Sequence, residues 1–168
     1  ENLATRQEAS TDAALSDLVS AGPLILTLTT GGLTLQEGDN DDNGVHAQGN
    51  ILLRTLAAAD IAQYSRIVST TGHVSIDTQG NFRQNADVRT EGLNNTIDIK
   101  TAASLDMLEG SRIVANDGDV RIQAAADIFL DNLRTGGGNI WLESLTGSID
   151  GYKSTIIEAA GLYLDGDL

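Results

Sequence analysis

The acidic stretch 37–44 has residue types and spacing suited to holding a metal ion. Asp39, Asp41 and Asn43, followed by Gly, reproduce the opening Asp-x-Asp-x-Asn-Gly of a calcium-binding loop, which places hard oxygen ligands around a turn. The bidentate Glu that closes such a loop is missing, because Asn50 stands at the twelfth position. Calcium is therefore a candidate cofactor, with a solvated acidic turn as the alternative, and no other cofactor is indicated.

The other side chains that could act as nucleophiles or metal ligands lack partners at the spacing that such a site requires. The chain has no Cys, which excludes thiol nucleophiles and Cys-ligated zinc. His46 and His73 stand alone, without the short spacing of a paired metal site. Ser and Thr are plentiful, but no His–Asp partnership accompanies them, so nucleophilic catalysis has no support.

A carboxylate cluster with a basic residue could cleave acidic polysaccharides, and Asp77, Asp98, Asp106 and Arg83 could supply one. Scattered carboxylates are nevertheless expected on every exposed face of a repetitive acidic chain. An acidic protein also repels a polyanionic substrate. We therefore expect no enzymatic activity, and a polysaccharide lyase or hydrolase is the least favoured alternative.

The elements that position these residues follow a repeat. Each unit opens with a small residue and then places apolar residues one position apart, and period-two alternation in short runs is typical of strands. A unit of this length, too short to bury its own core, must stack on its neighbours. The unit starts are Gly49, Gly72, Asn94, Gly118, Gly138 and Gly161, spaced 23, 22, 24, 20 and 23 residues apart.

Three short strands per unit predict an all-β fold, a parallel β-helix of about six coils of 20–26 residues over residues 22–168. Stacking places equivalent residues of neighbouring coils about 4.8 Å apart, so like charges there would repel. One outward strand position follows this rule, because its charges in successive units alternate in sign or pass through a neutral residue. That outward position reads Arg54, Asp77, Lys100, Gln123 and Glu143. At the preceding outward position, Asp98 and Arg121 should be neighbours.

Residues 1–21 form a separate N-terminal segment, in which we expect a short amphipathic helix over about 11–20. Thr11 can act as its N-cap, and Leu15, Leu18 and Val19 would share one face. This face would cover the first coil, in the same chain or in a neighbouring copy. An extended linker is the alternative.

The units beginning at Gly49, Gly118 and Gly138, such as Gly-Asp-Val-Arg-Ile-Gln-Ala-Ala-Ala-Asp-Ile, resemble filamentous-haemagglutinin-type repeats. The similarity covers roughly residues 22–166 and is one of coil architecture. The resemblance implies a secreted, right-handed β-helix at the bacterial cell surface, used in adhesion, filaments or matrix. It supplies no catalytic residues. Since no signal peptide precedes Glu1, we expect a mature or excised piece.

The charge balance restricts the partners. Ten basic and 24 acidic residues give a net charge of −14, which disfavours nucleic acid and anionic membranes and favours cations and basic partners. No stretch is long and apolar enough for a membrane span. No membrane insertion is therefore expected, and the resemblance to filamentous-haemagglutinin-type repeats implies an extracellular location.

The sequence favours a structural module that associates end to end. Leu162 and Leu164 open a coil that the sequence given does not finish, and they would join Leu15, Leu18 and Val19 as self-association residues. Their partners would be copies of the chain or adjoining repeats. The alternative is a calcium-dependent module that binds glycans or a host surface, for which Trp141 and Tyr163 offer outward planar rings.

Overall fold

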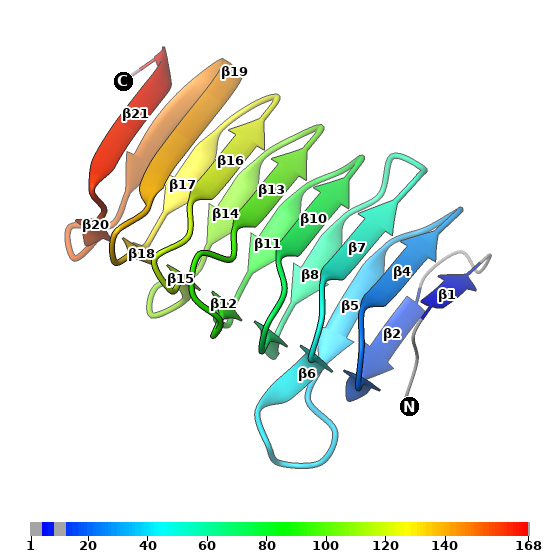
Figure 1. Cartoon of the computed structure of the whole chain (residues 1–168). Helices are drawn as coiled ribbons and strands as arrows, with labels where there is room; N and C mark the ends of the chain where they lie inside the picture. The colour runs from blue at the N-terminus through cyan, green and yellow to red at the C-terminus, as the bar shows by residue number, and fades with distance from the viewer. Residues whose placement is uncertain (1–4, 9–12, 168) are drawn as a thin grey trace.

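The chain forms a parallel β-solenoid. The computed structural model describes residues 5–8 and 13–167, which wind through about seven turns (Figure 1). Each turn contributes one strand to each of three faces, and equivalent strands of successive turns pair in parallel. Strand β19 continues around one corner and so joins two faces into a single 14-stranded sheet, while the third face is a 7-stranded sheet.

The strands run in chain order around the three faces. The first face contains β1 (Thr5–Glu8), β4 (Leu24–Leu28), β7 (Ile51–Thr55), β10 (Val74–Thr78), β13 (Ile97–Thr101), β16 (Val120–Ala124), the start of β19 (Asn139–Gly151) and β21 (Gly161–Asp167). The second contains β2 (Ala13–Ser16), β5 (Leu33–Gln36), β8 (Ile61–Gln63), β11 (Phe82–Gln84), β14 (Leu105–Met107), β17 (Ile128–Leu130) and the end of β19. The third contains β3 (Leu18–Ser20), β6 (Asn43–Ala47), β9 (Arg66–Ser69), β12 (Val88–Thr90), β15 (Arg112–Ala115), β18 (Asn132–Thr135) and β20 (Ile157–Glu158).

The core is one column of apolar side chains along the solenoid axis. Alternate residues of each strand point inward, so three-residue strands such as β11 and β14 bury their first and last side chains and expose the middle one. β-Branched residues dominate the first face, where their stiff side chains stack on like neighbours. One such fully buried ladder consists of Ile51, Val74, Ile97, Val120 and Ile140.

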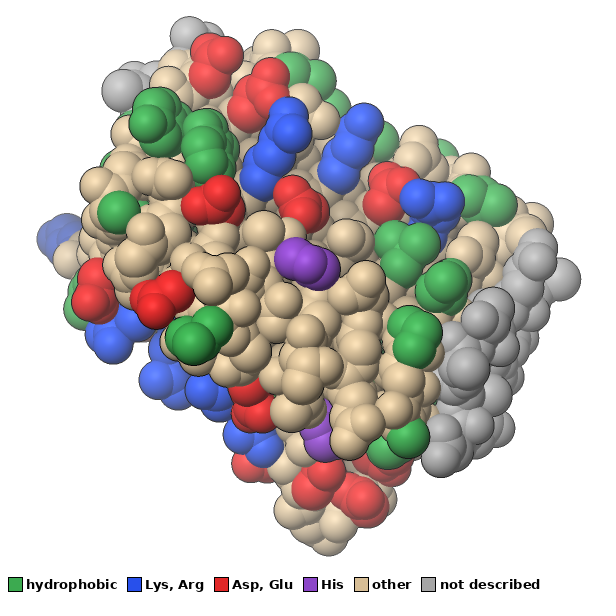
Figure 2. Space-filling view, in the orientation of Figure 1, with side chains coloured by type: hydrophobic (Ala, Val, Ile, Leu, Met, Phe, Trp, Pro, Cys, Tyr) green, Lys and Arg blue, Asp and Glu red, His purple; other side chains and the backbone are tan. Residues whose placement is uncertain are grey.

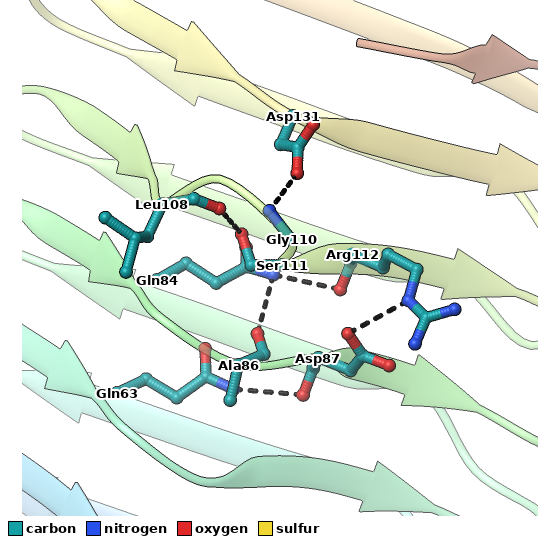
Figure 3. A network of polar contacts seen from close by, with 9 residues as sticks. All are labelled: Gln63, Gln84, Ala86, Asp87, Leu108, Gly110, Ser111, Arg112 and Asp131. Atoms are coloured by element: carbon teal, nitrogen blue, oxygen red, sulfur yellow. Dashed lines mark hydrogen bonds and ion pairs between the residues drawn. The ribbon is translucent and has the colours of Figure 1, made fainter. Parts of the chain in front are cut away.

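Buried amides hold the corner between the second and third faces (Figure 3). The Gln63 Nε2 group donates to the backbone carbonyls of Ser65 and, one turn further on, Asp87, both at 3.0 Å. The Gln84 Nε2 group likewise donates to the carbonyls of Ala86 and Arg112, both at 2.9 Å. Each glutamine therefore fastens its own corner to that of the next turn.

Short polar side chains make similar links at the corner between the first and second faces. The Asp60 Oδ1 atom accepts from the Asn81 backbone N–H at 2.7 Å and from its side-chain Nδ2 at 3.0 Å. The Asn81 Oδ1 atom then accepts from the Ser104 backbone N–H at 3.1 Å. These bonds satisfy backbone N–H groups at the corner, where the chain leaves the strand and has no partner in the sheet.

The predicted register is confirmed. Arg54 pairs with Asp77, Asp77 with Lys100, and the same column continues through Gln123, Glu143 and Asp165. Asp98 and Arg121 are register neighbours, as their opposite charges indicated. Hydrophobic spacing and charge alternation therefore determine the same alignment of turns.

The predicted N-terminal helix is wrong for the described residues. Residues 13–16 and 18–20 are strands β2 and β3, which pair with β5 and β6. Leu18 and Ser20 point inward while Val19 is exposed, and Asp17 has a left-handed backbone (φ 51°) that turns the corner between the strands. Pairing with the next turn overrides weak local helix propensity. Thr11, the expected N-cap, lies outside the described residues.

The number of turns also exceeds the expected six. Strands β1, β2 and β3 pair with β4, β5 and β6 and form an additional turn before residue 22. Within the described residues, no helix has the length and hydrophobicity needed to cross a membrane.

Replacing Asn81 tests the corner links. Asn81→Ala removes both its donation to Asp60 and its acceptance from Ser104, so we expect the free energy of unfolding to fall by roughly 1–2 kcal/mol. Urea denaturation monitored by circular dichroism measures this loss. Gln79→Ala is the control, since Gln79 is an exposed amide in the same corner, and an equal loss there would contradict the role of Asn81.

Candidate functional site

Four carboxylates converge at the loop between β5 and β6. The ligand oxygens of Asp17, Glu37, Asp39 and Asp41 all lie within 4.8 Å of one another. The calcium motif named Asp39 and Asp41 as ligands, but it named neither Glu37, which lies in the same acidic stretch, nor Asp17. Asp17 comes from the preceding turn and is brought in by stacking, so no local motif could indicate it. Carboxylate oxygens are hard ligands of the kind that calcium prefers.

Asn43 donates two hydrogen bonds to the Asp41 carboxylate. Its side-chain Nδ2 donates to Asp41 Oδ2 at 2.9 Å, and its backbone N–H donates to Asp41 Oδ1 at 2.6 Å. The backbone N–H groups of Asp41 and Asn40 donate in turn to Asp39 and Glu37. Asn43 therefore orients the Asp41 carboxylate, and the hydrogen-bonded loop also fits the alternative of a solvated acidic turn.

The two sequence-predicted aspartates differ in acidity. The side-chain and backbone N–H groups of Asn43 lower the pKa of Asp41 below its ordinary value, with a small further contribution from Arg66. The Asp41 backbone N–H lowers the pKa of Asp39, but slight desolvation and the negative charges of Asp41 and Asp17 outweigh it, so the net pKa of Asp39 is raised. A divalent cation would relieve the repulsion that raises it.

A calcium titration tests this loop as a metal site. If the cluster binds calcium, the ion should raise the melting temperature, and Asp39→Asn with Asp41→Asn should abolish the rise because two anionic ligands are lost. Differential scanning calorimetry with calcium or chelator measures the effect. Asp106→Asn, on the second face, is the control. A melting temperature that calcium leaves unchanged would establish the solvated acidic turn.

The Asn43 interaction makes a separate prediction about pH. Asn43→Ala should raise the pKa of Asp41 toward its ordinary value, because the side-chain donor is removed. Since the folded-state pKa of Asp41 is depressed, its contribution to loop stability is present above the unfolded-state value and lost as pH falls through the depressed value. Carboxyl ¹³C NMR titration measures the shift. An unchanged Asp41 pKa would contradict this role of Asn43.

An aromatic pair stands on the outer surface of the first face. Trp141 on β19 and Tyr163 on β21 are register neighbours whose rings stack with centroids 5.3 Å apart and planes 10° from parallel. Figure 2 shows hydrophobic side chains beside acidic ones at the β19–β21 end of this face, with Lys and Arg over the middle strands. The sequence predicted outward positions for both rings, and the structure brings them together.

A shallow groove of about 490 Å³ lies along this aromatic pair. Arg121 lines it as the register neighbour of Trp141. Its other charged residues are all acidic, and within the described part of the chain none of them forms an ion pair: Asp98, Asp119, Glu143 and Asp165. Aromatic surface beside uncompensated negative charge is suited to a ligand that carries positive charge.

A second groove of about 670 Å³ continues along the first face toward the N-terminus. It shares Asp98 and Arg121 with the first groove and passes Arg54, Asp77 and Lys100, so its charge alternates in sign. Arg54 and Asp77 form an ion pair at 3.0 Å. Along this face, uncompensated charge is therefore greatest at the β19–β21 end.

The four residues considered for polysaccharide cleavage are divided between two faces. Asp77 and Asp98 lie on β10 and β13 of the first face, whereas Arg83 and Asp106 are register neighbours on β11 and β14 of the second. The structure therefore does not assemble them into one cluster. Catalysis was not expected from the sequence, and that expectation stays a prediction.

The two histidines also lie apart. His46 is on β6 of the third face and contacts Thr70 Oγ1 at 3.2 Å. His73 stands at the start of the first face, where its Nδ1 atom accepts from the Thr96 backbone N–H at 2.9 Å. Both act in links between turns.

The proposed self-association residues occupy different environments. Leu162 and Leu164 continue the inward-facing columns of Ile140 and Leu142, yet each is 45% exposed because β21 pairs only with β19 in the described chain. At the other end, Leu18 is buried in the core, Leu15 is partly buried against it and Val19 faces outward.

Comparisons with known proteins return no match for this chain. No family model matches the chain, and searches of curated proteins and of solved structures find no significant match. The fold and the side-chain geometry therefore carry the functional argument.

Proposed function

We propose that the chain is a secreted structural repeat module of a bacterial surface filament, extracellular matrix or adhesin, which is lengthened by stacking of further turns on β21. One observation carries the proposal: Leu162 and Leu164 lie in core-facing columns but remain half exposed. An unpaired strand edge with apolar side chains is a template for another strand. The resemblance to filamentous-haemagglutinin-type repeats supports the cellular role, including location at the cell surface.

The added turn would come from a second copy or from adjoining repeats of a longer chain. In both cases its inward side chains would cover Leu162 and Leu164, as Ile140 and Leu142 cover Val120 and Ile122 within the solenoid. Burying this remaining apolar surface would contribute roughly 25 cal/mol per Å². The charge of −14 opposes association between copies, so salt should strengthen it.

Charging the β21 edge tests the proposal. Leu162→Glu with Leu164→Glu should shift concentration-dependent association toward monomer, because two carboxylates would be desolvated at the contact. Light scattering across protein concentration, with negative-stain imaging, measures it. Leu93→Glu is the control, since Leu93 is 66% exposed in a corner loop. A wild-type chain that stays monomeric at every concentration would contradict assembly between copies.

A module that binds glycans or a host surface is the second candidate. The groove beside Trp141 and Tyr163 favours it, because stacked rings and nearby hydrogen-bonding groups are common in ligand sites. Screening oligosaccharides against wild type and Trp141→Ala separates this candidate from the structural one. Binding that requires Trp141 would support it, and the absence of any bound oligosaccharide would remove it.

A further inference from the structure

Two outward columns of the first face end at β21. One column runs through Asp98, Arg121, Trp141 and Tyr163, and the other through Lys100, Gln123, Glu143 and Asp165. Their spacing equals that of neighbouring strands, about 4.8 Å, so each residue experiences the charge of the next. The last residue of each column, Tyr163 or Asp165, therefore indicates which type of side chain would be compatible at the same position of a strand paired with β21.

The column that ends at Asp165 has unbalanced charge. Near its start, Arg54 and Asp77 form an ion pair, and Lys100 follows Asp77 in register. At its end, Glu143 and Asp165 are adjacent acids. Glu143 accepts a hydrogen bond from Gln123 Nε2 at 2.6 Å, but no cation of the described chain pairs with either carboxylate. Adjacent like charges are destabilising, and a cation on the next strand would offset them.

The column that ends at Tyr163 also favours a cation. Arg121 precedes Trp141 in register, and Tyr163 follows with 54% of its surface exposed. A guanidinium stacks well on an aromatic face, and an Arg on the next strand would lie beside Tyr163 as Arg121 lies beside Trp141. Both outward positions beyond β21 therefore call for Arg or Lys.

The inward positions call for apolar residues, because Leu162 and Leu164 are the exposed ends of core columns. We propose that β21 binds a parallel strand of a partner chain in which apolar residues alternate with Arg or Lys. The main chain of that strand would pair with the edge of β21 that is unpaired among the described residues, its apolar side chains would cover the leucines, and its basic side chains would contact Tyr163 and Asp165. This inference rests on the proposed stacking role of β21.

The first strand of a second copy fits these requirements poorly. In an unchanged register, Arg6 would align with Leu164, because Arg6 aligns with Leu26 and Leu26 belongs to the register column that ends at Leu164. Thr5 and Gln7 would fall in the columns of Tyr163 and Asp165 and bring no cation. Self-association through β1 should therefore be weaker than binding of a basic strand.

Peptide binding tests the inference on the 168-residue chain. A capped, fluorescein-labelled peptide that alternates Ile and Arg is compared with one that alternates Ile and Glu, by fluorescence anisotropy at low and high salt. We expect the Arg peptide to bind at least about tenfold more tightly than the Glu peptide, with a difference that shrinks as salt rises. The bound Arg peptide should also dissociate any end-to-end oligomers seen by light scattering.

Variants locate the binding site. Asp165→Lys should reverse the preference between the two peptides, and Tyr163→Ala should weaken the Arg peptide while leaving the Glu peptide unchanged. Asp106→Lys, the same charge change on the second face, is the control and should leave both affinities within about twofold at high salt, since Asp106 lies on β14, which strand β17 separates from β19.

The experiments distinguish a wrong proposal of a basic partner strand from a wrong proposal that further turns stack on β21. Equal binding of both peptides would overturn the preference for a cation while leaving β21 as a stacking edge. If neither peptide binds but Leu162→Glu with Leu164→Glu still reduces association of the chain, a second copy is the occupant and the partner strand is overturned. Arg-peptide binding that Asp165→Lys does not weaken would place the contact elsewhere and overturn the inference.

Discussion

The stacking of parallel strands at a fixed spacing is the constraint on which the whole structure depends. Every residue lies about 4.8 Å from its equivalent in the neighbouring turns, so a column of side chains must be mutually compatible along its length. Inward columns satisfy this with Ile, Val and Leu. Corner columns satisfy it with amides such as Gln63 and Asn81, which bond to the next turn.

The same constraint determines where functional groups gather. Stacking brings Asp17 to the acidic loop from the preceding turn and puts Trp141 against Tyr163. Turns within the solenoid have paired neighbours on both sides. Among the described residues β21 pairs only with β19, so Leu162, Leu164 and Asp165 have a stacked neighbour on one side only. Assembly and ligand binding are therefore proposed for neighbouring parts of one surface.

The acidic loop and the β21 edge differ in what they offer a partner. The loop presents carboxylates that backbone N–H groups already bond, so a cation would compete with existing contacts. The edge presents apolar side chains, a stacked ring and an acid in separate columns. An edge of this kind can select a partner by the order of its residues, whereas the loop can select only by charge and size.

The sequence determined the coil architecture and its register from Gly49 onward, because spacing and charge alternation repeat at every turn and reinforce one another. The prediction from sequence was wrong for residues 13–20. The spacing of Leu and Val there suits a helix as well as a strand, and pairing with β5 and β6 determines that the segment is strand. The calcium motif also named Asn43, whose role as a ligand stays a prediction; in the structure its side chain donates to the nearby Asp41. Contacts between turns join residues about 20 positions apart. The proximity of Asp17 to Asp39 and the stacking of Trp141 on Tyr163 therefore depend on the register of the turns, which only the tertiary structure provides.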